Sequence, residues 1–181
     1  MASFARTYAH AVARLRVPFG FAMVVAFAWF AAPDTRSLAW GLPVAVVGLA
    51  LRAWAAGHLA KNERLATGGP YAYVRNPLYL GTALAAAGLA IASRQVALAG
   101  LFAAVFGLVY LPAIRLEEEY LSELFADYAT YAARVRMLWP RLRPAASGGR
   151  FEWRLYRKNE EYRALAGFLA GAALLVWKAW R

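Results

Sequence analysis

Long apolar runs constrain the fold of this chain more than any other feature of its sequence. Five runs are present, at 17–32, 38–60, 78–92, 96–114 and 164–180. A helix needs roughly 20 apolar residues to cross a hydrocarbon core about 30 Å thick, and each run reaches or approaches that length. The runs lack the alternation of a membrane β-barrel. The sequence therefore predicts an all-α integral membrane protein with about five transmembrane helices.

The composition supports this class and excludes several others. Of the 181 residues, 62% are hydrophobic and only 17% are charged, and the mean hydropathy is +0.41. The net charge of +11 would suggest a nucleic-acid partner for a soluble protein. In a membrane protein it is typical of loops that face anionic lipid, so we expect no nucleic acid. The absence of cysteine excludes disulfides and thiolate chemistry, and two histidines are too few for a metal site, so we predict no metal.

The distribution of basic residues predicts the orientation in the membrane. Loops on the amino-terminal side hold most of them, whereas the opposite side holds only Arg36, Arg94, Lys178 and Arg181. By the positive-inside rule the amino terminus is then cytoplasmic, and the chain fits a bacterial inner membrane. The first run ends in small residues, as a cleaved signal peptide does. We favour a retained helix because Pro33 follows the run directly.

A polar turn at 69–81, with the sequence G-P-Y-A-Y-V-R-N-P-L-Y-L-G, separates the second and third runs. Glycine tolerates positive φ and proline cannot continue a helix, so Gly69 and Pro70 are expected to end the preceding helix. Asn76 is expected to cap the next helix, with Pro77 as its first residue.

The tyrosines and the arginine of this turn suggest a site for a small polar ligand. The guanidinium of Arg75 can bind a carboxylate or a phosphate through two parallel hydrogen bonds. Its alternative role is to reach lipid phosphate from the interface. Tyr71, Tyr73 and Tyr79 taken singly are typical of an interfacial aromatic belt, but three beside one arginine favour a binding site.

Acidic residues follow the fourth run, on the same predicted side of the membrane as the turn. Pro112 predicts a kink at the end of that run. From Arg115 to about 140, apolar residues recur every three or four positions, which predicts an amphipathic helix. Glu117 and Glu118 begin it, and Arg52 inside the second run needs a buried partner, for which these two glutamates are candidates.

Two motifs in this chain resemble those of the isoprenylcysteine carboxyl methyltransferase and phospholipid methyltransferase group of integral membrane enzymes. Residues 69–81 resemble the signature G-P-Y-x-x-x-R-H-P-x-Y-x-G. Residues 117–140 match the second motif of the family. That motif consists of E-E-x-x-L followed by an aromatic residue, two tyrosines, a basic-Val pair and a proline. The resemblance covers roughly 45–140, within a single domain 1–181 whose residues 151–181 add an interfacial helix and the fifth span.

The resemblance implies an S-adenosylmethionine-dependent methyltransferase that acts on a lipid or lipophilic acceptor, either a carboxylate or an amine, at the cytoplasmic membrane face. The residues implied at the cofactor are Tyr73, Arg75, Asn76, Pro77, Tyr79, Gly81, Glu117 and Glu118. Those implied in catalysis are Arg75, Glu118 and Arg134. Asn76 departs from the family histidine, and asparagine can exchange hydrogen bonds but cannot carry a proton between groups.

Two other functions are compatible with parts of the sequence. Steroid and sterol reductases, which use NADPH, carry a similar R-H-P-x-Y-x-G stretch, although Thr82 stands where they have glutamate. A non-catalytic membrane protein that assembles, for example as a homodimer, through Gly167 and Gly171 is the third interpretation.

Overall fold

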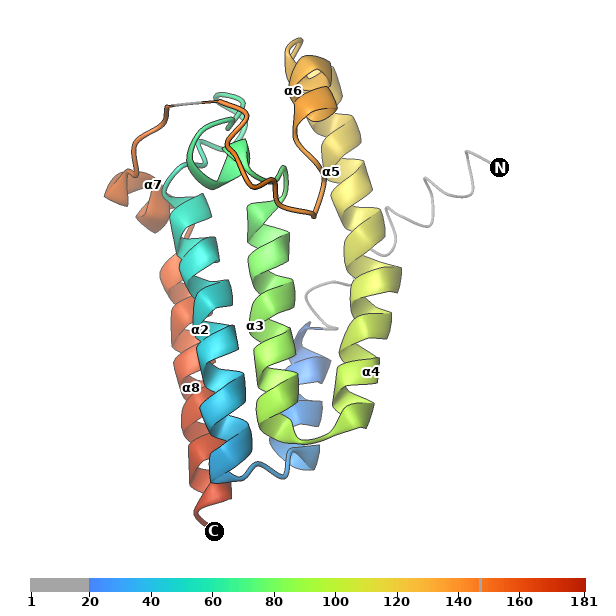
Figure 1. The fold of residues 1–181 in the computed structure, drawn as a ribbon, viewed down its shortest axis with the longest axis vertical. Coiled ribbons are helices and arrows are strands. Elements are labelled where there is room, and N and C mark those ends of the chain that lie inside the picture. Colours follow the sequence, from blue (N-terminus) through green and yellow to red (C-terminus); the bar gives the residue numbers. More distant parts are fainter. Residues whose placement is uncertain (1–19, 147) are drawn as a thin grey trace.

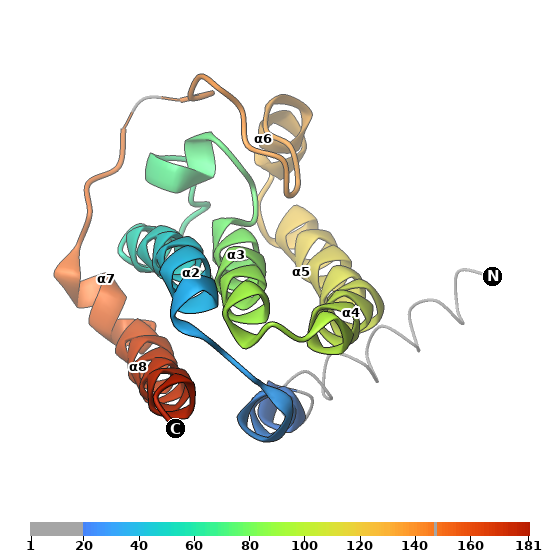
Figure 2. The ribbon, with the colours of Figure 1, turned by 60° about the horizontal axis from the view of Figure 1, so that its bottom comes forward.

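The structure is a computed structural model that describes residues 20–146 and 148–181, and this part of the chain is helical with no strand. The basic segment 1–16 and the start of the first run lie outside the described residues. The bundle consists of Gly20–Phe30, α2 (Thr35–Ala56), α3 (Pro77–Ser93), α4 (Val96–Val105), α5 (Leu111–Leu124) and α8 (Glu161–Ala179). In Figures 1 and 2, α8, α2, α3 and the joined α4 and α5 stand side by side, and Gly20–Phe30 lies across from them.

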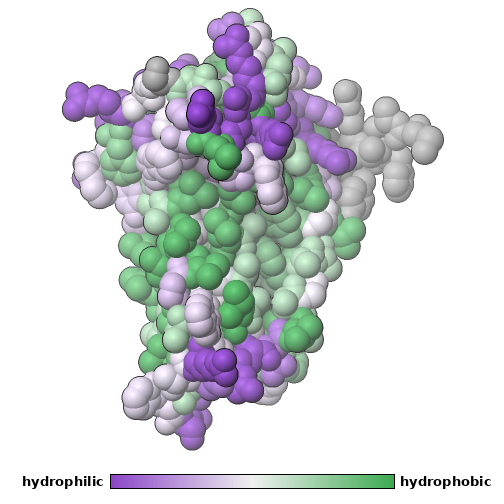
Figure 3. All heavy atoms as spheres, viewed as in Figure 1, coloured by the Kyte–Doolittle hydropathy of each residue, from purple (hydrophilic) through white to green (hydrophobic). Residues whose placement is uncertain are grey.

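Three of these helices are long and apolar enough to cross a membrane. They are Thr35–Ala56, Val96–Leu124, which joins α4 to α5, and Glu161–Ala179. Gly20–Phe30 and Pro77–Ser93 are apolar but shorter. The space-filling view shows a wide apolar belt between two polar ends, as expected of a membrane protein (Figure 3). The prediction of an all-helical membrane protein is confirmed, whereas the number of five spans stays a prediction.

Glycines allow α2 and α3 to pack closely. A Cβ atom on Gly48 would lie 2.4 Å from the backbone nitrogen of Ala85, and one on Gly88 would lie 2.3 Å from that of Ala45. Small residues at such contacts let two backbones approach within a membrane. This contact holds the polar end of α3, which begins at Pro77, in a fixed position against α2.

The fourth run continues into the acidic helix instead of ending before it. A π-helical turn, Phe106–Tyr110, joins α4 to α5 directly before Pro112, which cannot donate a backbone hydrogen bond. The predicted amphipathic helix from 115 to 140 is therefore wrong in its extent. Its first half belongs to the long helix, the chain is extended at Phe125, and α6 (Tyr128–Arg134) forms a separate helix.

The polar end of the bundle is built by backbone pairing between two distant segments. The short 3₁₀ helix η1 (Gly69–Ala72) and the residues after it lie against the chain that follows α6. Arg75 donates its backbone N–H to the carbonyl of Arg136 at 2.9 Å, and Arg141 donates to the carbonyl of Tyr73 at 2.9 Å. Further along, α7 (Trp153–Lys158) leads into α8. The turn at 69–81 and the end of the acidic segment thus form one unit.

The opposite end of the bundle is closed by shorter links. Asp34 caps α2 by accepting from the backbone N–H of Ser37 at 2.7 Å, and it also forms an exposed ion pair with Arg94. The Lys178 ammonium donates to the carbonyl of Ala28 at 3.0 Å. Arg94 and Lys178 therefore share one end of the bundle, as the charge distribution predicts.

Candidate functional site

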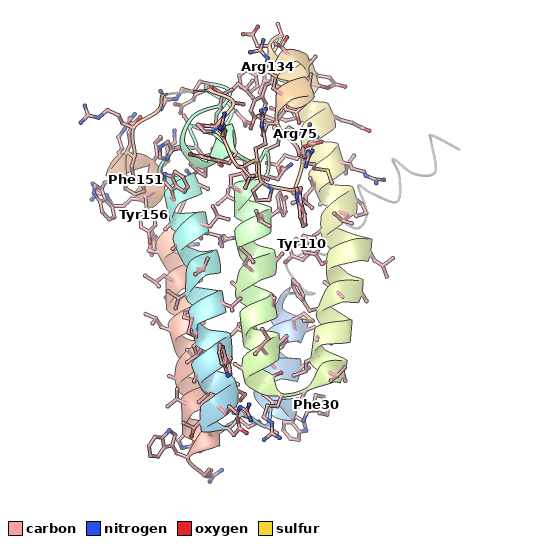
Figure 4. The ribbon with its side chains drawn as sticks, viewed as in Figure 1. Phe30, Arg75, Tyr110, Arg134, Phe151 and Tyr156 are labelled. Carbon is pink, nitrogen blue, oxygen red and sulfur yellow. The ribbon has the colours of Figure 1, made fainter. Side chains whose placement is uncertain are left out.

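Arg75 and Glu118 form a two-pronged ion pair at the polar ends of α3 and α5. Nε of Arg75 lies 2.8 Å from one carboxylate oxygen of Glu118, and Nη2 lies 2.9 Å from the other. Both side chains are mostly buried, at 16% and 17% exposure. Figure 4 shows Arg75 between the two helices. The structure thus joins the turn at 69–81 to the acidic motif.

The remaining donors of Arg75 face backbone carbonyls. Its Nη1 donates to the carbonyl of Ala132 at 2.9 Å and to that of Val135 at 3.0 Å, both in or next to α6. Burial opposes the charge of Arg75, but the hydrogen bonds and charge of Glu118 outweigh it and raise the pKa of the guanidinium. Because four N–H groups are already engaged, Arg75 holds the site together and has little capacity left for a ligand.

Asn76 occupies the expected cap position of α3 but makes a different contact. Its side chain makes no capping hydrogen bond and instead donates to Glu118 at 2.8 Å and to the carbonyl of Met137 at 3.3 Å. A hydrogen bond to an ionised carboxylate is stronger than one to a neutral acceptor, which explains the preference. The side-chain capping predicted for Asn76 is therefore wrong, and the residue supports Glu118.

Tyr79 and Glu117 form a second link between α3 and α5. The Tyr79 hydroxyl donates to a carboxylate oxygen of Glu117 at 2.9 Å. Both residues line two neighbouring cavities, one of about 440 Å³ at the polar end and one of about 720 Å³ deeper in the bundle. These volumes lie in the range typical of small-molecule sites. Tyr79 and Glu117 therefore stand where the two cavities meet.

The polar-end cavity is lined by the turn at 69–81, the loop after α2, and helices α5 and α6. Two tyrosine hydroxyls at this cavity, those of Tyr71 and Tyr128, are buried, and within the described residues neither makes a hydrogen bond of normal geometry, although Tyr128 lies close to the Glu118 carboxylate. Burial raises the pKa of both phenols above the ordinary value, so they stay neutral donors. Buried polar groups are normally paired, so these two hydroxyls are candidates for hydrogen bonds to a polar ligand.

The deeper cavity is lined by Gly20–Phe30, α2, α3, the π turn, α5 and α8, and it contains a second ion pair. Nε of Arg52 lies 2.6 Å from one oxygen of Glu161 and Nη2 lies 3.0 Å from the other, while Nη1 donates to the Thr82 hydroxyl. The predicted partners of Arg52, Glu117 or Glu118, are thus wrong. Apolar and aromatic residues from Gly20–Phe30 and the π turn complete this cavity, among them Phe21, Val24 and Tyr110. Figure 4 shows Tyr110 on the π turn.

The structure brings most predicted site residues together but separates three from the cavities. Glu118 is bound to Arg75 and Asn76 beside the polar-end cavity. The predicted residues that line this cavity are Arg75, Asn76, Pro77, Tyr79 and Glu117.

Tyr73, Gly81 and Arg134 line neither cavity. Tyr73 packs against Trp54, with ring centroids 6.3 Å apart, and Gly81 packs against Gly48 and Arg52 of α2. Arg134 is exposed on α6 (Figure 4). The placement of these three residues at the cofactor or the reacting atoms is therefore not supported by the structure.

Other residues at the cavities were not singled out from the sequence as ligand contacts. No sequence pattern marks Glu161 as a cavity residue. The one available argument is that Arg52, inside an apolar run, requires an acidic partner. Tyr128 belongs to the second motif, but only its buried hydroxyl marks it as a binding group. Within 20–146 and 148–181, no group of three or more acidic, histidine or cysteine residues is arranged to hold a metal ion.

Comparison with known proteins identifies one family and two relatives. The family described as phospholipid methyltransferase has a model that matches residues 39–128, from within α2 to the start of α6. The cobalt-zinc-cadmium resistance protein CzcN of Cupriavidus metallidurans is 36% identical over 104 residues, which are 56% of this chain and 47% of the relative.

The nickel-cobalt-cadmium resistance protein NccN of Alcaligenes xylosoxydans xylosoxydans matches to the same extent, 36% over 104 residues. This chain therefore spans about half the length of the curated relatives it matches, with 47% of each covered. No solved structure matches it.

Proposed function

This chain belongs to the phospholipid methyltransferase family, and from that membership and the geometry of the site we propose that it transfers a methyl group from S-adenosylmethionine to a lipid or lipophilic small molecule. The observation that carries the proposal is the meeting of two cavities at Tyr79 and Glu117, beside the Arg75–Glu118 pair. One cavity lies at the polar end of the bundle, and the other lies between the helices, where Phe21, Val24 and Tyr110 line it together with the Arg52–Glu161 pair. A transferase needs room for both a methyl donor and an acceptor.

The polar-end cavity fits S-adenosylmethionine. Its volume of about 440 Å³ is sufficient for a ligand of that size, and the buried hydroxyls of Tyr71 and Tyr128 can bond to polar groups of the ligand. Lys61 and Arg64 at the same cavity can attract a carboxylate. When bound, S-adenosylmethionine supplies a methyl group activated by a positively charged sulfur, and tyrosine faces stabilise such a cation.

The residues of the site would act mainly by positioning. Arg75 and Asn76 fix Glu118, and the three together tie α3 to α5 and α6. Methyl transfer is an in-line displacement, so a rigid arrangement of donor and acceptor supplies much of the rate acceleration. The acceptor would enter the deeper cavity from the bilayer, between Gly20–Phe30 and the helices across from it. The polar end would then face the cytoplasm, with the amino terminus inside, as in a bacterial inner membrane.

The first test is cofactor binding by the protein in lipid nanodiscs. We expect S-adenosylmethionine and S-adenosylhomocysteine to bind in isothermal titration and NADPH not to bind. Replacing both Tyr71 and Tyr128 with phenylalanine should weaken S-adenosylhomocysteine about tenfold or more, since two hydrogen bonds are lost. The matched control is Tyr162→Phe, an exposed tyrosine of α8. NADPH binding without S-adenosylmethionine binding would favour a reductase instead.

The second test identifies the acceptor. The protein is incubated with methyl-labelled S-adenosylmethionine and a total lipid extract, and the labelled product is analysed. We expect label in a lipophilic product, and none with the Arg75→Ala variant. A protein that binds the cofactor and labels no lipid or lipophilic compound would contradict the proposed acceptor class.

A further inference from the structure

A cluster of basic residues precedes α8 and takes no part in the two cavities. Its four members are exposed and lie within nine residues of the chain; they are Arg150, Arg154, Arg157 and Lys158. The same stretch contains one acid, Glu152, whose carboxylate accepts a hydrogen bond from Arg64 at 2.8 Å. Lys158 pairs with Glu63.

Most of the positive charge of this cluster is not neutralised by the protein. Within 20–146 and 148–181, neither Arg150 nor Arg157 forms an ion pair. Arg154 reaches Glu152 only at 3.9 Å, and 78% of its side chain is exposed. The three guanidinium groups are therefore available to an anionic partner.

Exposed aromatic side chains lie among these charges. Trp153 is 69% exposed, and the ring centroid of Phe151 lies 5.0 Å from its own. Figure 4 shows Phe151 and Tyr156 together at α7, at the edge of the bundle. Tryptophan and tyrosine prefer the headgroup level of a bilayer, and a short helix that combines them with basic residues is typical of the membrane interface.

The other face of α7 is fixed to the bundle. Leu155 is fully buried, and the side-chain amide of Asn159 donates to the carbonyls of Ala56 and Leu59, at 2.9 and 2.8 Å. These two carbonyls lie at and just beyond the end of α2. The contacts hold α7 in one position, so its basic and aromatic side chains form a surface that exists before any partner binds.

This surface lies next to a helix that can span a membrane. Asn159 and Glu160 alone separate α7 from α8, and the φ of Glu160 is +54°, a left-handed conformation that turns the chain between the two helices. Figure 1 shows α7 beside the polar end of α2, near the border of the apolar belt in Figure 3. Clusters of four or more basic residues directly beside a span attract anionic lipid headgroups.

We propose that α7, together with Arg150 and Phe151 before it, is a docking surface for the phosphate headgroups of an anionic lipid bilayer. Arg154 and Arg157 lie three residues apart on one face of the helix, and their planar guanidinium groups suit headgroup phosphates. Trp153 enters the headgroup level beside them. A bilayer fits this surface better than an acidic protein does, because lipid already surrounds the adjoining span.

The surface is independent of the proposed function. It lies outside residues 39–128, which the family model matches, and its binding can be measured without cofactor or acceptor.

The test compares two double variants that lose the same charge at opposite ends of the bundle. One is Arg154→Gln with Arg157→Gln, and the matched control is Arg36→Gln with Arg181→Gln, two exposed arginines of the other end. Each purified protein is titrated in detergent with dioleoylphosphatidylglycerol or dioleoylphosphatidylcholine, and native mass spectrometry measures the lipid that stays bound. Thermal unfolding in the same detergent establishes that each variant is folded.

We expect the wild type to bind phosphatidylglycerol about tenfold or more tightly than phosphatidylcholine. This preference should fall about tenfold in the Arg154 and Arg157 variant, because each basic residue near anionic headgroups contributes roughly fivefold to binding. It should also weaken as the salt concentration rises, since exposed charges are screened. The Arg36 and Arg181 control should keep the wild-type preference.

Three results would overturn the docking surface. Equal binding of the two lipids by the wild type would remove its partner, and an unchanged preference in the Arg154 and Arg157 variant would place the lipid elsewhere. An equal loss in both double variants would show that lipid binding follows net charge alone. If the wild type prefers neither lipid but binds hexaglutamate, and the Arg154 and Arg157 variant does not, the surface belongs to an acidic protein instead.

Discussion

The two arginine–glutamate pairs have the same local geometry but join different parts of the molecule. Arg75 and Glu118 connect the turn at 69–81 with α5 at the polar end, and backbone carbonyls next to α6 share the guanidinium. Arg52 and Glu161 connect α2 with α8, which lies outside the region that the family model matches. The first pair shapes the candidate cofactor cavity, and the second fixes a helix that closes the deeper cavity.

The comparison teaches that a charge pair can serve either a site or the fold. Glu161 is 7% exposed, so removal of Arg52, whose side chain is 23% exposed, leaves a buried carboxylate without this partner. The Arg75 pair lies at a cavity that a ligand would enter, and its geometry is supported by a third side chain, Asn76. Breaking the Arg52–Glu161 pair should affect mainly stability, and breaking the Arg75–Glu118 pair should affect mainly binding.

The largest effect is expected when Arg52 is replaced by methionine. Glu161 then loses both of its hydrogen bonds, and removal of one partner from a buried pair costs about 3–5 kcal/mol of stability. Thermal unfolding in detergent, followed by tryptophan fluorescence, measures the loss. The double variant Arg52→Met with Glu161→Leu should recover most of the stability, because it leaves no unpaired charge. A double variant as unstable as the single one would show that the helices α2 and α8 need the charges themselves.

Replacing Arg75 tests whether the Arg75–Glu118 pair supports ligand binding. Arg75→Ala should cost about 2–4 kcal/mol, less than Arg52→Met because Glu118 keeps the hydrogen bond that Asn76 donates. Its affinity for S-adenosylhomocysteine should fall about 100-fold, since Glu118 and α6 lose their common anchor. Arg75→Lys keeps the positive charge but not the two-pronged geometry. Its affinity for S-adenosylhomocysteine should therefore lie between those of the wild type and Arg75→Ala. Unchanged affinity in a folded Arg75→Ala variant would contradict the site.

The close contact of α2 with α3 positions both arginines, and Gly48→Ala tests it. The added Cβ would lie 2.4 Å from a backbone nitrogen of α3, and overpacking of this kind costs about 1–3 kcal/mol. Gly167→Ala on α8 is the matched control, because nothing lies within 4 Å of a Cβ at that position. We expect the unfolding temperature to fall for the first variant only. A change in oligomeric state for Gly167→Ala would support assembly through Gly167 and Gly171, the third interpretation of the sequence.

The smallest effect concerns alkaline pH. Burial raises the pKa of Tyr71, so the folded chain keeps a proton that the unfolded chain releases above about pH 10. The stability from this group is fully present below about pH 10 and falls as the pH rises further, by about 1.4 kcal/mol at pH 11. Tyr71→Phe should unfold with a weaker dependence on pH between about 9 and 11. At pH 7 it should be as stable as the wild type, because the lost hydroxyl has no partner.

Local sequence patterns predicted the helices and the main turn well. Each apolar run coincides with a described helix over most of its length, because helical residues in lipid satisfy their own backbone groups. The interruption near Pro112 was predicted from the residue itself, and the structure places a π turn directly before it. The break at Phe125 was missed, since the apolar periodicity continues through it into α6.

The candidate site was predicted less completely. The proximity of the 69–81 turn and the acidic motif followed from their common side of the membrane and from the family resemblance. Gly81 lies within the motif but serves helix packing, and Tyr71, not Tyr73, lines the polar-end cavity. Motif spacing indicates which segments take part, whereas the direction of each side chain depends on the backbone that the rest of the fold imposes.

The sequence by itself determined the class of protein, the positions of its apolar helices and the two segments that meet at the polar end, because these depend on short-range hydrophobicity and turn chemistry. Only the tertiary structure decided which charges pair. Glu118 rather than Glu117 binds Arg75, 43 residues away, and Glu161 binds Arg52 across 109 residues. Partners so distant are selected by how whole helices pack in space, and that packing also places Glu117 beside Tyr79 at both cavities.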